Sequence, residues 1–222
     1  MKKQLIYLFF AINSVAFSQK DNLKLGDSYA EDQIYAAISY SKLFNQPNNT
    51  TGSGFSYSFS TGFLKDFTLN KSGSFSIALG AGYGFDALHH GFKITEITNN
   101  TVFEIDVPTA ATEPNNLKTH SLELPFEIRW RTSNATKYKF WRVYTGIKFT
   151  YNFINTFHYN TTSFVNVNRF NKWQYGITLS TGYDAFNIQV YYGLTPILKD
   201  ASVGVNTINT QIVKFGFVFY IL

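Results

Sequence analysis

Five charged residues on two consecutive segments are the part of this sequence whose types and spacing could do chemistry. They are Glu123, Glu127, Arg129, Arg142 and Lys148. The first three alternate with apolar residues in "SLELPFEIRWR" (121–131), and the last two do so in "FWRVYTGIKFTY" (140–151). Because alternate residues of a β-strand lie on one face, each segment would gather its charges on a single face. Such a group could form ion pairs, line a pore or exchange protons.

The two segments are close enough in sequence to form a hairpin. A turn near residues 134–135 would bring Glu127 close to Arg142. It would also bring Glu123 close to Gly146 or Lys148. Buried charges need partners, so the simplest interpretation is a structural ion-pair network that fills the inside of a barrel. A selectivity or gating element of a small pore is the alternative. A catalytic role for the two glutamates is the weakest of these hypotheses, because a nearby arginine keeps both carboxylates ionised.

Histidine and cysteine provide little further chemistry. The histidines lie in or beside long loops, without carboxylates at ligand spacing: His89, His90, His120 and His158. We therefore expect no metal, no cofactor and no enzymatic activity. A lipid hydrolase would need Ser and His together on one face, whereas the adjacent His120 and Ser121 would point to opposite faces. The absence of cysteine excludes disulfides and thiolate ligands.

Alternating segments that could position these charges recur along the whole chain. Eight segments are predicted as strands: 33–44, 54–63, 74–86, 121–131, 140–151, 173–184, 187–195 and 212–222. The connections after the second, fourth and sixth segments are short, and the others are long and rich in Asn, Thr, Pro and Gly. An even number of strands with short turns on one rim and long loops on the other is typical of bacterial outer-membrane barrels.

The polarity of the two faces decides between a soluble and a membrane barrel. The polar face carries mostly Ser, Gly and Thr, and only 15% of all residues are charged, against 18% aromatic. A soluble surface would carry more charge, whereas a narrow lumen favours small side chains. Strands of nine to thirteen residues and aromatic residues near strand ends also suit a bilayer. We predict an all-β, eight-stranded antiparallel up-and-down transmembrane β-barrel with its apolar face in lipid.

The N-terminus predicts export. Residues 1–18 contain two lysines, a short apolar core and small residues before Gln19, as in a cleaved secretory signal peptide. We expect residues 19–33 to form a periplasmic segment and 34–222 the outer-membrane barrel. Removing the leader lowers the basic residues from 19 to 17 against 14 acidic ones, so a nucleic-acid partner is not expected.

"SLELPFEIRWR", "WRVYTGIKFTY", "WQYGITLSTGYD" and "YYGLTPI" resemble the PorT-type outer-membrane β-barrel proteins of Bacteroidetes. The resemblance covers roughly Ile34 to Leu222 and implies an eight-stranded porin-like outer-membrane barrel. The founding member is tied to type IX secretion and gliding, and its segment between the fourth and fifth strands is more basic than "TSNATKYKF" here. The resemblance implies no catalytic residues.

Together these observations predict a structural or interaction protein of the outer membrane, with a lumen filled by side chains. A small porin or channel and an accessory component of the type IX secretion and gliding machinery are the alternatives. Expected partners are outer-membrane lipid, lipopolysaccharide and an extracellular or secretion-machinery protein that contacts the long loops. Pro125 cannot donate to a β-ladder, so we expect a bulge or bend there.

Overall fold

The structure is a computed structural model of an all-β chain. It describes residues 32–46, 54–97, 100–105, 115–132, 141–159, 161–183, 186–203 and 206–221. The predicted signal peptide and the predicted periplasmic segment up to residue 31 lie outside the described residues. Among the residues described, no helix is both long enough and apolar enough to cross a membrane.

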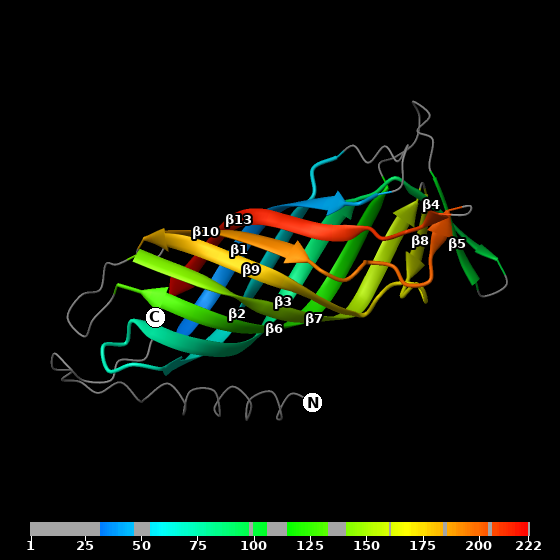
Figure 1. Ribbon diagram of the computed structural model, residues 1–222. Coiled ribbons are helices and arrows are strands. Elements are labelled where there is room, and N and C mark those ends of the chain that lie inside the picture. Colours follow the sequence, from blue (N-terminus) through cyan, green and yellow to red (C-terminus); the bar gives the residue numbers. More distant parts are fainter. Residues whose placement is uncertain are drawn as a thin grey trace, which may run out of the picture.

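Eight strands of the nine-stranded main sheet form the barrel and correspond in order to the eight predicted segments. They are β1 (Gln33–Phe44), β2 (Tyr57–Thr68), β3 (Phe75–His89), β6 (Asn116–Arg131), β7 (Trp141–Tyr159), β9 (Trp173–Tyr183), β10 (Phe186–Gly193) and β13 (Gln211–Ile221). Shorter strands lie in the connections: β4 (Phe92–Ile97), β5 (Asn100–Ile105), β8 (Thr162–Val165), β11 (Ser202–Val203) and β12 (Asn206–Thr207). Of these, β8 is the ninth strand of the main sheet and pairs with β7. The hairpin that β4 and β5 form and the strand β8 lie at the same end of the molecule (Figure 1).

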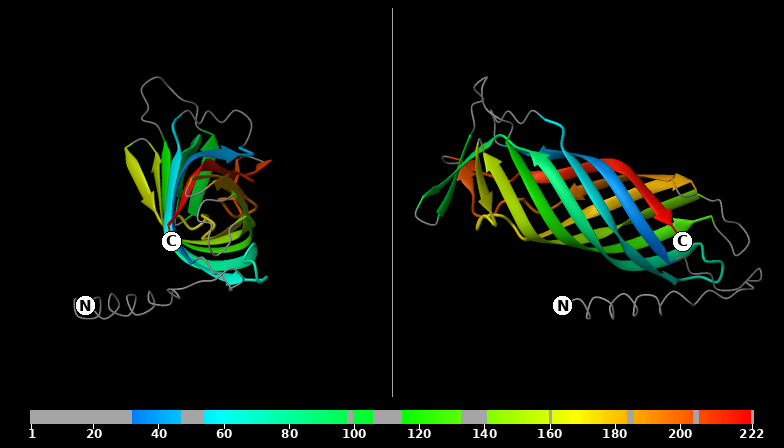
Figure 2. Two further views of the ribbon diagram at one scale, coloured as in Figure 1. Left: turned by 90° about the vertical axis from the view of Figure 1, so that its left-hand side faces the viewer. Right: turned by 180° about the vertical axis from the view of Figure 1, so that it is seen from behind.

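The main sheet closes on itself. Its strands follow the order β6-β3-β2-β1-β13-β10-β9-β7, and β6 also pairs with β7. Each of these pairings is antiparallel, and β1 meets the C-terminal strand with Ile34 opposite Ile221. The inclined strands and the closed wall are visible in Figure 2. The eight-stranded antiparallel up-and-down barrel is therefore confirmed. We call the rim with the connections β2–β3, β6–β7 and β9–β10 the short-turn end. The opposite rim, with the connections β1–β2, β3–β6, β7–β9 and β10–β13, is the loop end.

Several strands extend further toward the loop end than the sequence pattern indicated. The longest are β6, with 16 residues, and β7, with 19. Their pairing shifts register between His120 and Ser121, which lie opposite Ile154 and Asn152, so Phe153 is an extra residue on β7. This bulge moves the outward-facing positions of β7 by one residue and interrupts the simple alternation that the sequence shows.

We expected a bulge or bend at Pro125, and the prediction of a bulge is wrong. Pro125 lies opposite Lys148 in an unshifted register with β7. On the other side, β3 pairs Leu79 with Phe126 and Gly82 with Glu123, so the register is kept although the ladder is interrupted at Leu124 and Pro125. The bulge lies at Phe153 instead. Proline, which has no N–H, therefore fits into β6 without a shift of register. The one-residue bulge is on the neighbouring strand β7.

The barrel has an apolar outside and a polar inside. Burial alternates residue by residue along the strands, as in β1 and β9. Large apolar residues are exposed on every barrel strand, for example Ile38, Phe63, Ile147, Leu179 and Phe217. Such a surface would be unfavourable in water, whereas it matches the hydrocarbon core of a bilayer. The predicted orientation of the two faces is therefore what the structure has.

Three threonine hydroxyls on the outer face form hydrogen bonds with the neighbouring strand. Each donates to a backbone carbonyl of the adjacent strand: Thr61 to Tyr35 at 2.9 Å, Thr145 to Thr178 at 3.1 Å and Thr181 to Arg142 at 3.1 Å. A hydroxyl in lipid has no water to bond, so these contacts remove the cost of placing threonine on the outer face.

The inside of the barrel has two parts. Toward the short-turn end and the middle it is lined by polar and charged side chains. At the loop end lies a buried apolar cluster, which we call the loop cap. Its residues are Leu43, Leu88, Leu117, Phe157, Val167, Phe170, Ile197, Leu198, Ala201, Ile208 and Ile212. Most of them come from strand ends and from the connections 161–172 and 194–210, so these connections pack on the mouth of the barrel.

Candidate functional site

The centre of the lumen holds the ion pair between Glu123 and Lys148. Lys148 Nζ donates to Glu123 Oε1 at 2.8 Å, and the hydroxyl of Tyr35 donates to Glu123 Oε2 at 3.2 Å. The three residues come from β7, β6 and β1 and are all buried. The predicted proximity of Glu123 and Lys148 is therefore what the structure shows. Both carboxylate oxygens have a donor, so this buried charge is well compensated.

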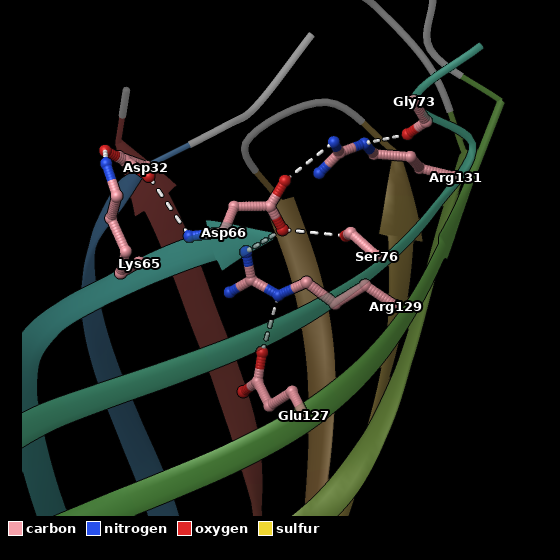
Figure 3. A network of polar contacts seen from close by, with 8 residues as sticks. All are labelled: Asp32, Lys65, Asp66, Gly73, Ser76, Glu127, Arg129 and Arg131. Carbon is pink, nitrogen blue, oxygen red and sulfur yellow. Dashed lines mark hydrogen bonds and ion pairs between the residues drawn. The ribbon is translucent and has the colours of Figure 1, made fainter. Parts of the chain in front are cut away.

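A second group of charges is centred on Asp66 near the short-turn end (Figure 3). The Asp66 carboxylate accepts from Arg131 Nη2 at 2.8 Å, from Arg129 Nη1 at 3.3 Å and from Ser76 Oγ at 2.7 Å. Arg129 Nε donates in turn to Glu127 Oε2 at 2.9 Å. Both arginine side chains have zero exposure. A carboxylate with three donors and two guanidinium partners is a well-satisfied buried anion.

This group is tied to the turn between β2 and β3. Arg131 Nε donates to the carbonyl oxygen of Gly73 at 2.7 Å. Gly73 has a φ of 70°, a left-handed conformation that favours glycine. Asp32 lies on the outside of the same rim, where it accepts from the backbone N–H of Asp66 at 3.0 Å and pairs with Lys65 at 2.5 Å. The ionic group therefore holds both the wall and the turn at the short-turn end.

Arg142 does not pair as the sequence suggested. In the observed register Glu127 lies opposite Gly146, and Arg142 lies opposite Arg131. This register differs from the one that a turn at residues 134–135 would give. Glu127 takes its cation from Arg129, two residues away on the same face, and the guanidinium of Arg142 lies 6.0 Å from the ring centroid of Tyr220. The expected contact between Glu127 and Arg142 is therefore replaced by one within β6.

A third ion pair lies nearer the loop end and was missed in the sequence. Lys214 Nζ on β13 lies 2.5 Å from Asp86 Oδ1 on β3, and Thr119 donates to the other oxygen of Asp86 at 3.4 Å. The ring of Tyr191 lies between this pair and the central one, 5.4 Å from Lys214 Nζ and 5.1 Å from Lys148 Nζ. Cation–π contacts of this kind stabilise desolvated ammonium groups.

The missed residues carry a recognisable signal. Asp66, Asp86, Arg131 and Lys214 all lie on the inward-facing parity of their strands and are buried or largely so. Arg131 was in the same charged parity as Glu127, and Asp86 ended the polar parity of its segment. Asp66 follows the predicted end of its segment, so extending that segment to Thr68 would have included it. Listing the charged residues at the inward-facing alternate positions of all eight strands would have identified the whole network.

Large tyrosines fill the space that small residues leave in the lumen. The ring of Tyr35 lies against Gly62 and Gly82, where added Cβ atoms would clash with it. The ring of Tyr191 lies against Gly176 in the same way, at 2.5 Å from the position of a Cβ atom. The glycines that the sequence places on the polar face therefore make room for aromatic rings, which leave little open volume.

The residual space beside the central pair is small. A cavity of about 10 Å³ is lined by Tyr35, Ser60, Leu64, Glu123, Pro125, Glu127, Lys148, Thr178, Gln189, Val218 and Tyr220. This is on the order of the volume that one water molecule needs, and the lining offers several hydrogen-bonding partners. This cavity can therefore hold about one internal water molecule beside Glu123 and Glu127.

Metal and hydrolase chemistry find no support in the described residues. No group of three or more His, Asp or Glu side chains that could hold a metal ion occurs in that part of the chain. His120 Nδ1 lies 2.6 Å from the Tyr83 hydroxyl on the outer face, whereas Ser121 is buried and donates to the carbonyl of Gly84. His120 and Ser121 thus point to opposite faces, as predicted. His158 Nδ1 forms a hydrogen bond with Ser163 Oγ at 2.7 Å across the hairpin of β7 and β8.

A closed antiparallel barrel with apolar side chains outside and buried ion pairs inside is the architecture of an outer-membrane β-barrel. The comparison with protein families agrees. The profile of the outer membrane protein beta-barrel domain matches residues 17–199, and the chain belongs to this family. Membership indicates the outer membrane as its location.

Comparison with individual proteins adds little. No curated protein sequence matches the chain. Two similar solved structures are variants of the Rhodopseudomonas blastica porin, a triple mutant with 7% identity and a TM-score of 0.21, and a double mutant with 6% and 0.20. Each alignment covers 87% of this chain and 100% of the porin chain. These similarities are too low to bear on the fold or function of this chain.

Proposed function

We propose that this outer-membrane barrel is a closed, non-conducting protein with a structural or interaction role, which it performs through its loop end. The observation that supports this most is the filling of the lumen. Three groups of ion pairs lie in it from the short-turn end toward the loop end, where the buried apolar side chains of the loop cap gather. A solute would have to break buried ion pairs to pass, and each such break is costly.

A role as an enzyme is not part of this proposal. The charged residues of the lumen are engaged with one another, and the adjacent cavity has room for about one water molecule. The surface left for a specific partner is the loop end, where connections are carried by a rigid barrel. We propose that partners are outer-membrane lipid and an extracellular or secretion-machinery protein.

Solute flux through reconstituted liposomes tests the closed lumen. Proteoliposomes that contain the folded barrel are diluted into an isosmotic solution of a small sugar, and swelling is followed by light scattering. We expect the swelling rate to equal that of empty liposomes. Swelling that increases with the amount of folded protein would support the small porin or channel instead.

The resemblance to PorT-type barrels of Bacteroidetes supplies a second candidate, an accessory component of type IX secretion and gliding. The motifs that carry it, "LELP" and "YGLT", lie on β6 and at the end of β10. Deletion of the gene should then impair secretion and gliding, and unchanged secretion and gliding would exclude this role. The mass of the mature protein would test the proposed removal of residues 1–18 as a signal peptide.

A further inference from the structure

The wall of the barrel continues above β9 and β10 as an irregular ladder. Phe170 and Leu198 form an isolated antiparallel bridge there. It is flanked by backbone hydrogen bonds from Asn171 N–H to Ile197 O at 2.9 Å and from Lys199 N–H to Arg169 O at 2.8 Å. Phe170 and Leu198 are buried in the loop cap. The pairing places Arg169 directly opposite Lys199 at the upper edge of this wall.

Three cations lie on the two segments that form this ladder. Lys172 and Lys199 are exposed and Arg169 is half-buried. We call Arg169, Lys172 and Lys199 the basic patch. Within the described residues none of the three forms an ion pair. Residues 160–172 contain no acidic side chain, and Asp200 is the one acid in residues 194–210. Like charges directly opposite on paired strands repel each other, so an anion shared between them would be stabilising.

The basic patch lies just above an aromatic belt on the outer face. Trp173 follows Lys172 directly, is 61% exposed and packs on Tyr151 with ring centroids 4.7 Å apart. The backbone carbonyl of Lys172 accepts a hydrogen bond from Asn152 N–H at 2.8 Å, which fixes its position on the wall. Exposed Trp and Tyr rings mark the level of lipid headgroups. Arg169 lies four residues before Trp173, at most about 13 Å along an extended chain.

From this geometry we propose that the basic patch binds the phosphate groups of an outer-leaflet lipid headgroup. Arginine and lysine together suit such a ligand, because guanidinium can bind phosphate oxygens in pairs and ammonium adds a compact charge. The long side chains can reach down to the headgroup level while their stems cover the wall. The proposal rests on the membrane placement of the loop end in the proposed function and names the lipid partner of that surface.

Lipid binding by the folded protein in detergent tests this inference. The probe is a bis-phosphorylated lipid A, and bound lipid is counted by native mass spectrometry across a concentration series. A single charge near a membrane surface contributes roughly a fivefold change in affinity. We expect Lys199→Gln to weaken binding roughly fivefold, and Arg169→Gln combined with Lys199→Gln on the order of 25-fold.

Lys118→Gln is the matched control, because Lys118 is also an exposed lysine near the loop end but lies on β6, which β7 separates from β9. The affinity of the Lys118→Gln variant for lipid A should stay within about twofold of that of the unsubstituted protein. Equal losses for Lys118→Gln and Lys199→Gln would indicate diffuse attraction and overturn the site. Unchanged binding in the double variant would overturn it too.

Two further arms identify the source of the phosphate. The same lipid without its phosphates should bind no better to the unsubstituted protein than to the double variant. Inorganic phosphate at millimolar concentration should not displace the lipid, and displacement would assign the patch to free anions instead. A shift in gel mobility between unheated and boiled samples shows that each variant is folded. Liposome swelling reports on the closed lumen separately, so either proposal can fail without the other.

Discussion

Lys148 on β7 and Glu123 on β6 form an ion pair of 2.8 Å in the centre of the lumen, and Tyr35 on β1 binds the other oxygen of the same carboxylate. The ion pair joins two neighbouring strands, and the hydrogen bond from Tyr35 reaches the same carboxylate from β1 across the inside of the barrel. Because both charges are buried, losing one partner exposes the other to the full cost of desolvation. The lumen is therefore a source of stability only while its pairs stay complete.

Lys148→Met should destabilise the barrel by about 3–5 kcal/mol, since it leaves Glu123 buried without its cation. The double variant Lys148→Met with Glu123→Gln should recover most of this loss, because no unpaired charge remains. Urea unfolding in detergent micelles or lipid vesicles measures both free energies. Equal losses in the single and double variants would show that the cost is one of packing rather than of charge.

Asp66→Asn should cost about 3–5 kcal/mol, because Arg129 and Arg131 lose the anion that both contact. Asp32→Asn is the matched control. Asp32 also pairs with a cation, Lys65, but their side chains are 36% and 52% exposed, so we expect a loss of at most about 1 kcal/mol. Unfolding midpoints of the two variants in urea make the comparison. A loss at Asp66 no larger than at Asp32 would contradict the role of this group.

Gly146→Ala should destabilise by about 1–3 kcal/mol, because the added Cβ would clash with the backbone carbonyl of Phe126 on β6. Gly193→Ala is a suitable comparison. There the nearest atom, the carbonyl oxygen of Ile212, lies 3.0 Å from the Cβ position, and the strand has less to shift. We expect a loss below about 1 kcal/mol for this variant. Thermal unfolding followed by gel mobility distinguishes the two.

Leu179→Arg should destabilise by about 2–4 kcal/mol, since Leu179 lies near the middle of the outer face of β9 and a cation there would sit in hydrocarbon. Val165→Arg, on β8 beyond the barrel, should change stability by no more than about 0.5 kcal/mol. Unfolding in lipid vesicles measures both. Tolerance of arginine at Leu179 would place the outer face in water.

Single cysteines test which rim faces outward, because the chain contains none of its own. Asp200→Cys at the loop end should react with a membrane-impermeant maleimide in intact cells. Lys71→Cys, in the exposed turn between β2 and β3, should react only after the outer membrane is permeabilised. The reverse pattern would invert the barrel in the membrane and remove the basis for outer-leaflet lipid at the basic patch.

The fold was predictable because alternation, strand length and loop length all point to one architecture. The central ion pair was predictable too, since Glu123 and Lys148 face inward on paired strands. The Glu127 contact was not, because it depends on a turn position that the residues between the strands do not specify. The bulge at Phe153 was hidden in the same way, as two consecutive outward residues resemble an ordinary irregularity.

The loop cap could not be predicted from periodicity. Its members come from strand ends and from connections with no regular alternation, such as Val167, Phe170 and Ile197. Their common feature is apolar side chains within otherwise polar loops. A long polar loop that carries isolated apolar residues is consistent with packing onto the barrel, but the partners follow only from the closed three-dimensional arrangement.

Single-channel recording in planar bilayers tests the closed lumen most directly. Purified, folded protein is added to a bilayer, and heat-modifiability on a gel establishes that the sample is folded. We expect no conductance steps above those of the bare membrane, because our proposal is that the ion pairs around Asp66, Glu123 and Asp86, together with the loop cap, fill the lumen. Reproducible, stable steps whose frequency rises with the amount of folded protein would contradict the account and make the barrel a channel.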